Sequence, residues 1–295
     1  MSMPLSGTER RHPASDDLHR LDPAEAMALL LGAQRAALAA VEPAIPDLAR
    51  AAAAGVQALR GGGRMGYAGA GSSGLMALAD CLELPGTFGL SPDRTPMLFA
   101  GGSDALLRMH GHVEDDTASA LADLDRAGLG AGDAIIVVSA SGTTPYALAV
   151  AQGARARGVT VTGIANVPGS ALLRAADIPV LLDTGPEMVA GSTRMGAATA
   201  QKVALNMVSV LVGIGLGHVH AGLMVNLVAD NAKLVERAAR IVSDLAGVPD
   251  GAARDALKRT GGAVKSAILV ARGADPDAAR AALQDSGGHL GALMG

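Results

Sequence analysis

Aromatic side chains are nearly absent from this chain. Its 295 residues include two Phe, two Tyr and no Trp. Stacking on aromatic rings is a common way to bind single-stranded nucleic acid, so stacking on bases or sugar faces is excluded as the main mode of recognition. The sequence also has no basic stripe. Its net charge is −4, and the charged residues form no long run of one sign. Nucleic acid is therefore not expected as a partner.

Cysteine and long hydrophobic runs are equally scarce. The single cysteine, Cys81, excludes an intramolecular disulfide and favours a reducing cytoplasm. The charged N-terminal segment has no apolar run typical of a secretion signal. The most apolar stretch, 203–216, is interrupted by Asn206 and Ser209 and is shorter than the roughly 20 residues that a membrane-spanning helix needs. We expect a cytoplasmic protein without a membrane partner.

What the chain has is 49% hydrophobic residues, arranged as short apolar runs alternating with helical periodicity. This pattern predicts an α/β fold with a mainly parallel sheet. Expected strands lie at 65–69, 96–100, 134–139, 160–165 and 178–182. Expected helices within this region lie at 74–82, 103–109, 116–126, 145–157, 169–175 and 193–216.

Helices are also expected on both sides of the α/β region. Two precede it, at 24–41 and 45–60, behind a polar arm of about 22 residues. The strands are expected to stop after residue 220, where four short helices follow at 231–246, 250–260, 263–272 and 276–284. The sequence thus predicts an N-terminal arm with helices (1–60), an α/β domain (61–222) and a helical C-terminal domain (223–295).

A glycine- and serine-rich loop at 69–74 follows the first strand and precedes a helix. At a helix N-terminus, backbone N–H groups and the hydroxyls of Ser72 and Ser73 favour an anion such as phosphate. The same spacing, G-x-G-x-x-G, also matches a dinucleotide-binding loop. Asp104, close to the end of the next strand, keeps the dinucleotide interpretation open.

A second loop of the same kind follows the most apolar strand. It contains Ser139, Ser141 and Thr144 and runs into a helix that begins at Pro145. Two strand–loop–helix units of this type favour one phosphate held from two sides, because a dinucleotide site would need only one glycine loop.

Two carboxylates are candidates for acid–base chemistry. Glu83 is expected at the C-terminus of its helix, because Pro85 disfavours helix at residue 84. Apolar neighbours and the helix dipole should then raise its pKa, as a general acid requires, although a solvated helix-end carboxylate fits the sequence as well. Glu114 is the free member of an acidic cluster in which Asp115 or Asp116 can cap the next helix.

Other clusters carry weaker signals. His110 and His112 have no cysteine nearby and no zinc-type spacing, so no metal is expected. Ser192 or Thr193 can cap the long helix, which places the cation of Arg194 at the electrostatically unfavourable end. Arg194 is therefore expected to serve an anionic ligand or a carboxylate such as Glu187.

The chain resembles N-acetylmuramic acid 6-phosphate etherases, which belong to the sugar-isomerase (SIS) group of phosphosugar-binding domains. The resemblance covers nearly the whole chain from about Thr8 onward. It rests on segments 69–74, 83–89, 100–102, 114–115, 139–146, 166–170, 185–187, 191–195, 199–207 and 223–225. The most specific of these are 191–195, 199–207 and 223–225.

The resemblance implies a SIS-type three-layer sandwich and a lyase that works without metal or organic cofactor. Such an enzyme cleaves the D-lactyl ether of N-acetylmuramic acid 6-phosphate, giving N-acetylglucosamine 6-phosphate and D-lactate during recycling of cell-wall amino sugars. The proton donor of the family falls on Glu83 and its second carboxylate on Glu114. The residues expected to bind the phosphorylated amino sugar are Ser72, Ser73, Ser139, Ser141, Thr144, Glu187, Ser192 and Arg194.

The chain also departs from the pattern of that family. Leu75 and Thr143 stand where Arg is usual, Gly196 replaces a usual Lys, and Ala221-Gly222 replaces Gly-Asn. His12 and His19 stand where Asn and Asp are usual. Each lost cation removes a contact to phosphate or carboxylate worth about 1.5–3 kcal/mol. A phosphosugar isomerase and a non-catalytic phosphosugar sensor therefore remain alternatives.

Helix geometry suggests a dimer. Ser72 and Glu83 are 11 residues apart in sequence, which corresponds to about 16 Å along a helix. One sugar would hardly reach both in the same chain, so the sequence predicts a homodimer in which Glu83 serves the pocket of a neighbouring subunit.

Overall fold

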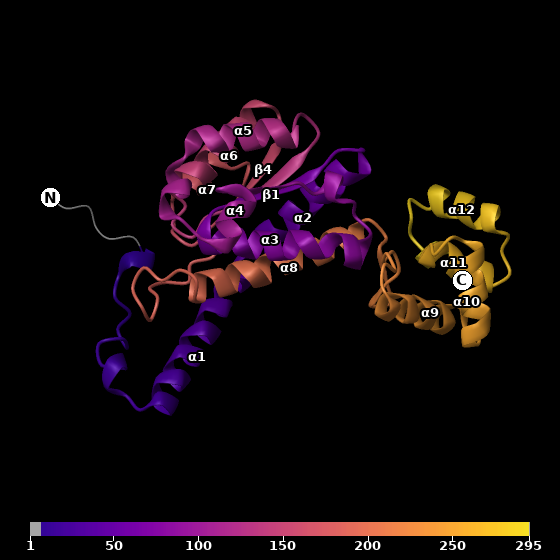
Figure 1. Cartoon of the computed structure of the whole chain (residues 1–295), viewed down its shortest axis with the longest axis horizontal. Coiled ribbons are helices and arrows are strands. Elements are labelled where there is room, and N and C mark those ends of the chain that lie inside the picture. The colour runs from indigo at the N-terminus through magenta and orange to yellow at the C-terminus, as the bar shows by residue number, and fades with distance from the viewer. Residues whose placement is uncertain (1–6, 295) are drawn as a thin grey trace. The chain divides into compact units, whose positions relative to one another are not determined.

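The structure is a computed structural model that describes residues 7–294 (Figure 1). Its contacts divide the chain into two compact units. The first extends to Cys81 and continues from Asp93 to Ser209, and the second comprises Leu82–Pro92 and the part from Val210 onward. Two of the three boundaries, at 81/82 and at 209/210, fall inside the long helices Gly71–Phe88 and Gly196–Gly215, so the units do not follow simple sequence blocks.

The first unit is built on a five-stranded parallel sheet of order β2-β1-β3-β4-β5. The strands are β1 (Met65–Gly69), β2 (Met97–Phe99), β3 (Ala134–Val138), β4 (Thr160–Ala165) and β5 (Ile178–Leu181). All residues of β1 and β3 are buried, as is typical of a parallel sheet covered on both faces. The five expected strands and the α/β fold class are confirmed.

Helices cover both faces of this sheet (Figure 1). One face carries α5 (Thr117–Ala127), α6 (Pro145–Ala156) and α7 (Ala171–Ala175), and the other carries α2 (Ile45–Arg60), α3 (Gly71–Phe88) and α8 (Gly196–Gly215). The core between the sheet and α5 and α6 is made mostly of Ala, Val and Leu, such as Ala147, Val150 and Leu124. Small side chains let these helices approach the strands closely, which gives the three-layer sandwich.

The N-terminal segment is folded rather than extended. It contains short 3₁₀ turns at Gly7–Glu9 and Leu18–Arg20, and the carbonyl of the buried Thr8 accepts a hydrogen bond from the Gly191 N–H at 3.0 Å. Helix α1 (Pro23–Ala39) begins where the sequence predicts, because Asp22 caps the Ala24 N–H at 2.7 Å. Residues 1–6 of the expected arm lie outside the described residues.

Helix α3 is longer than the sequence suggests. It was expected to end near residue 82, but it continues through Pro85 to Phe88. Proline removes one helical hydrogen bond; that loss is offset here by packing, because Leu84 and Phe88 are almost fully buried. Phe88 lies directly against Gly213 of α8, where a Cβ added to the glycine would come within 2.6 Å of the phenyl ring.

The second unit has its own core around α9 (Ala232–Ala246), α10 (Asp250–Arg259), α11 (Val264–Ala271) and α12 (Pro276–Asp285). These are the four expected C-terminal helices. A small antiparallel hairpin precedes them, formed by β6 (Val219–His220) and β7 (Leu223–Met224). The expectation that strands stop after residue 220 is thus wrong, because two-residue strands leave no periodicity to detect.

Two helical segments among residues 7–294 are long and apolar enough to span a membrane by length and composition alone. They are 23–60, which is mostly exposed, and α8, about half of which is buried. Buried helices of water-soluble proteins pass the same test, so α8 is explained by its place against the sheet. The remaining short elements are α4 (Gly102–Leu107) and 3₁₀ turns at Glu42–Ala44, Pro92–Arg94, Gly111–Asp115 and Gly291–Leu293.

Candidate active site

Both hydroxyl-rich loops leave the same edge of the sheet from neighbouring strands. Strands β1 and β3 pair in register, so Gly69 lies opposite Val138 at their carboxyl ends. The loops also touch, because the Ala140 N–H donates to the Ser73 hydroxyl oxygen at 3.2 Å. Ligands of open parallel sheets bind at this edge. The structure therefore places the two loops together, as the sequence predicts.

Glycines bring the helix start close to the strand. A Cβ on Gly69 would lie 2.8 Å from the Cα of Gly74, so neither residue has space for a side chain. Helix α3 begins at once, and its first-turn N–H groups have no helical acceptor. Ser72 is half-buried in that turn, whereas Ser73 is buried and turned toward the second loop. Ser72 can face an anion while Ser73 braces the loops.

The second loop is held by its own hydroxyls. Ser139 and Thr144 share a hydrogen bond of 2.9 Å, and the Ser139 hydroxyl also accepts from the Gly142 N–H at 3.1 Å. The Ser141 hydroxyl accepts from the N–H of Thr143 at 3.2 Å. Gly142 has a φ of 65° and lies against the Ser170 side chain, so a Cβ there would clash. Ser141 and Thr144 remain partly accessible at the rim of this loop.

Glu114 lies directly beside the first loop. A Cβ on Gly71 would come within 2.6 Å of the Glu114 Oε1, so the missing side chain of Gly71 makes room for this carboxylate. Glu114 is half-buried in the 3₁₀ turn Gly111–Asp115. Burial raises the pKa of Glu114 above its ordinary value, and the Asp115 carboxylate raises it further. Asp116 caps α5 by accepting from the Ser119 N–H at 2.9 Å, as expected for one member of the acidic cluster.

Glu83 has different surroundings. It lies within α3 rather than at its end, and its side chain is exposed. The sequence predicts that apolar neighbours bury Glu83, and within one chain they do not. Leu84 is buried in the core, and Leu82 is itself 68% exposed. Glu83 belongs to the second compact unit. Its pairing with Glu114 stays a prediction.

Glu187 has a structural role that the sequence did not reveal. Its buried carboxylate accepts from the N–H groups of Gly196 at 2.9 Å and Ala197 at 2.8 Å, which caps α8. The helix thus begins at Gly196 instead of residue 193, and the expected capping by Ser192 or Thr193 is wrong. Gly196 is also crowded, because a Cβ would lie 3.1 Å from both Glu187 and Ala37.

Ser192 and Arg194 lie in the loop before α8. Ser192 is half-buried and Arg194 is exposed. Within residues 7–294 no ion pair involves Arg194, so the expected pairing with Glu187 is not formed. Its guanidinium is available to an anionic ligand.

A buried polar network in the first unit was missed by sequence reasoning. The Asp80 carboxylate accepts from the Tyr67 hydroxyl at 2.9 Å, from Asn206 Nδ2 at 2.6 Å and from the Ser209 hydroxyl at 2.8 Å. It joins α3 to β1 and α8. The signal in the sequence is an acidic residue, Asp80, inside an apolar helix. The sequence alone does not show which donors meet this carboxylate.

No metal site is apparent in the described part of the chain, where no three potential ligands of the His, Cys, Asp or Glu type come together. His110 and His112 only approach each other, with ring centroids 5.6 Å apart. Asp104 is exposed in the first turn of α4, not at a strand end.

The sheet and its paired hydroxyl loops define a SIS-type phosphosugar-binding domain. The SIS domain family model matches residues 32–166. Among solved structures, a phosphoheptose isomerase from Francisella tularensis is similar with a TM-score of 0.50 and 18% sequence identity, covering 65% of this chain and 97% of that one. This likeness concerns the fold alone.

Sequence relatives narrow the class. A protein of Deinococcus radiodurans is 43% identical over 289 residues, covering 98% of this chain and 95% of the relative, and one of Rubrobacter xylanophilus is 41% identical with the same coverages. Both are named N-acetylmuramic acid 6-phosphate etherase. The chain belongs to the N-acetylmuramic acid 6-phosphate etherase family.

Proposed function

We propose that this protein is a carbon–oxygen lyase that cleaves the D-lactyl ether of N-acetylmuramic acid 6-phosphate. The products are N-acetylglucosamine 6-phosphate and D-lactate, as in the recycling of cell-wall amino sugars. Family membership supports this substrate, and the observation that carries the chemistry is the half-buried Glu114 carboxylate beside the first hydroxyl-rich loop.

The reaction needs two proton-transfer groups. In the ring-opened sugar the C1 aldehyde acidifies the C2 proton, so a carboxylate can remove it. The C3–O bond then breaks, the lactyl oxygen takes a proton from an acid, and water adds to the resulting double bond. The atoms balance without an oxidant or reductant. Glu114, whose pKa is raised, and Glu83 are the proposed acid–base pair.

The phosphate is assigned to the rims of the two loops. Ser72, Ser141 and Thr144 are partly accessible there, and the start of α3 adds backbone donors. Ser73 and Ser139 brace the loops through their hydrogen bonds. Arg194 and Ser192 are proposed to meet the sugar or its carboxylate, and Glu187 acts on them indirectly by fixing the start of α8.

A homodimer is part of the proposal. Helix α1 has one buried residue, Ala37, and exposes apolar side chains that include Met27 at 71% and Leu31 at 51%. Stacked apolar side chains on a soluble helix need a cover, and a second copy provides one. The exposed Glu83 then serves a partner's loops, and a cytoplasmic location follows from the intracellular origin of a phosphorylated sugar.

The test is incubation of the purified protein with N-acetylmuramic acid 6-phosphate and an enzymatic assay for D-lactate. We expect release that is lost in Glu114→Gln. Absence of lactate, together with interconversion of an ether-free phosphosugar, would favour an isomerase. A ligand-induced rise in melting temperature without any turnover would favour a sensor, the alternative that the missing cations at Leu75 and Thr143 suggest.

A further inference from the structure

The second unit contains a pocket that has no part in the proposed reaction. Its volume is about 410 Å³, and it lies between the β6–β7 hairpin and one face of α9. Leu223, Met224 and Ile241 form an apolar lining. Such a size fits the range of small-molecule sites, which starts near about 300 Å³. The pocket is therefore large enough for an organic molecule rather than a single ion.

Arg237 places a cation at this pocket that has no acidic partner among residues 7–294. Its side chain is half-buried, yet within the described chain its guanidinium has a single hydrogen-bond contact, 3.8 Å to the Met224 sulfur. A thioether is a weak acceptor, and a guanidinium has five donors. Arg254, on the neighbouring helix, shows the contrast, because Glu236 and Asp250 both pair with it. Arg237 lacks such an anion.

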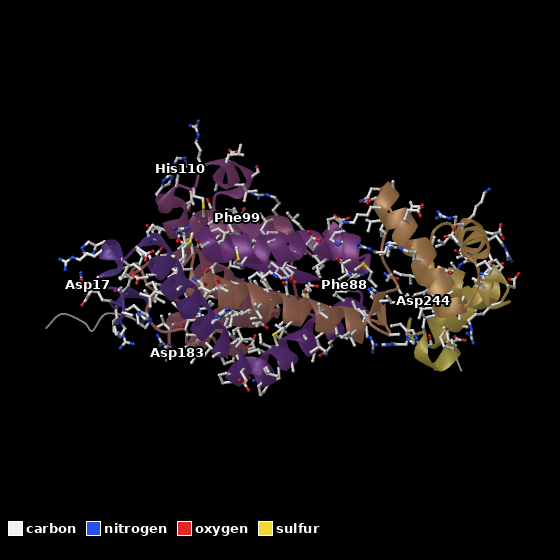
Figure 2. All side chains as sticks on the ribbon, turned by 90° about the horizontal axis from the view of Figure 1, so that it is seen from below. Asp17, Phe88, Phe99, His110, Asp183 and Asp244 are labelled. Atoms are coloured by element: carbon white, nitrogen blue, oxygen red, sulfur yellow. The ribbon has the colours of Figure 1, made fainter. Side chains whose placement is uncertain are left out.

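Two more charged side chains line the same pocket. Arg240 and Asp244 follow Arg237 at spacings of three and seven residues, which places all three on one face of α9. Asp244 is labelled on this helix in Figure 2. Glu236, four residues before Arg240 on the same helix, is already bound by the two terminal guanidinium nitrogens of Arg254. The pocket thus combines two available cations with one carboxylate.

The hairpin that borders the pocket has a two-residue turn. Ala221 has a φ of 49° and Gly222 a φ of 76°, so both turn residues are left-handed. Glycine adopts this conformation freely, but for alanine it is strained. Positive φ at both positions is the ordinary geometry of a two-residue hairpin turn, and Gly222 lines the pocket. The turn thus forms one fixed wall of the pocket.

We propose that this pocket binds a small organic oxyanion that carries an apolar group. Arg237 and Arg240 hold the carboxylate or phosphate, the hairpin and Ile241 contact the apolar part, and Asp244 accepts from a hydroxyl or ammonium group. The site lies wholly within the second unit and uses none of the residues assigned to lactyl ether cleavage. It does not depend on the proposed function.

Calorimetric titration of the full-length protein at low salt tests the proposal, with hexanoate and hexyl phosphate as probes and hexanol as the neutral control. We expect saturable binding of at least one anion and none of hexanol. Arg237→Ala and, separately, Arg240→Ala should each weaken binding by about tenfold or more. Binding of hexanoate but not of hexyl phosphate would identify the ligand as a carboxylate. Tighter binding of hexyl phosphate would identify it as a phosphate ester.

Arg259→Ala is the matched control, because Arg259 is exposed on α10 in the same unit and its replacement removes the same charge. The affinity of this variant should equal that of the unaltered protein. If Arg259→Ala weakens anion binding as much as Arg237→Ala does, the loss of affinity reflects net charge alone, and the proposal is overturned. Binding of neither anion, equal binding of hexanol, or unchanged affinity in folded Arg240→Ala would also overturn it. Circular dichroism confirms the fold of each variant.

Discussion

The two carboxylates assigned to catalysis occupy opposite kinds of environment along α3. At the start of the helix, Glu114 is half-buried against Gly71 of the first hydroxyl-rich loop. Three turns further on, Glu83 is exposed on the helix surface. The first environment supports the proposed acid–base chemistry within one chain. The second lacks such surroundings within one chain, and for this reason we propose that a second subunit covers it.

The largest expected effect comes from removing either carboxylate. Glu114→Gln and Glu83→Gln should each lower the rate of lactate release by about 10²–10⁴-fold, the usual contribution of a general acid or base. Glu83→Gln should leave the melting temperature unchanged, because the side chain is exposed. Normal kcat and KM in Glu83→Gln would contradict the proposed pair, because Glu114 would then act without Glu83. Steady-state kinetics measures both constants.

The buried anchor of α3 gives the next largest effect, on stability. Asp80→Ala leaves the Tyr67 hydroxyl, Asn206 and Ser209 without their acceptor. Unpaired buried polar groups cost about 1–3 kcal/mol each, so the free energy of unfolding should fall by about 3 kcal/mol or more. Urea denaturation measures this. Asp104→Ala, at an exposed position on α4, is the control and should change it by less than about 0.5 kcal/mol; equal losses would mean that Asp80 anchors nothing.

A smaller effect is expected from alanine substitutions at glycines near the two ends of α3. Gly71→Ala places a Cβ in a left-handed position with φ 56° and against Glu114, so it should cost about 1–2 kcal/mol and displace the carboxylate. Lactate release should fall by about tenfold or more. Gly86→Ala, in the same helix with nothing within 4 Å of the new Cβ, should stabilise by about 0.5–1 kcal/mol and leave activity unchanged. Similar behaviour of both variants would contradict the assigned contact.

The smallest effect is a pH dependence of stability that involves Glu114. Because burial raises the pKa of Glu114 in the folded state, the folded protein binds its proton more tightly than the unfolded chain does. Stability is therefore lost as pH rises from the unfolded pKa, about 4.3, through the raised folded pKa. Glu114→Gln should melt at a higher temperature than the unaltered protein at neutral pH.

That difference should vanish on acidification, since both side chains are then neutral. If Glu114→Gln raises the melting temperature equally under acidic and neutral conditions, the rise comes from packing and not from the charge of Glu114. Calorimetric melts across this range measure the difference.

Much of the fold was predictable because local pattern and tertiary structure agree. The five strands are short apolar runs between glycine-rich turns, and Asp22 followed by Pro23 marks the start of α1. Prediction failed where packing overrode local preference. Pro85 stays inside α3 because Leu84 and Phe88 are buried, and the start of α8 is set by Glu187, nine residues earlier in sequence.

The site was predictable in part. Two hydroxyl-rich loops after neighbouring strands indicated a phosphate site, and the structure joins them through Ser73 and Ala140. The fit of Glu114 against Gly71 was not predictable, because it joins segments 43 residues apart that share no pattern. The Asp80 network and the Arg237 pocket likewise depend on contacts between elements. Sequence identifies the groups, and only the fold determines which of them meet.

The central claim, that one chain supplies the loops with Glu114 and another supplies Glu83, is tested most directly by subunit mixing. Inactive Glu83→Ala protein is mixed with the inactive Ser72→Ala/Ser141→Ala variant, and subunit exchange is verified by native mass spectrometry. A shared site predicts that lactate release returns, because each mixed dimer has one pocket with both intact halves. Verified exchange without any recovery would show that each chain contains a complete site of its own.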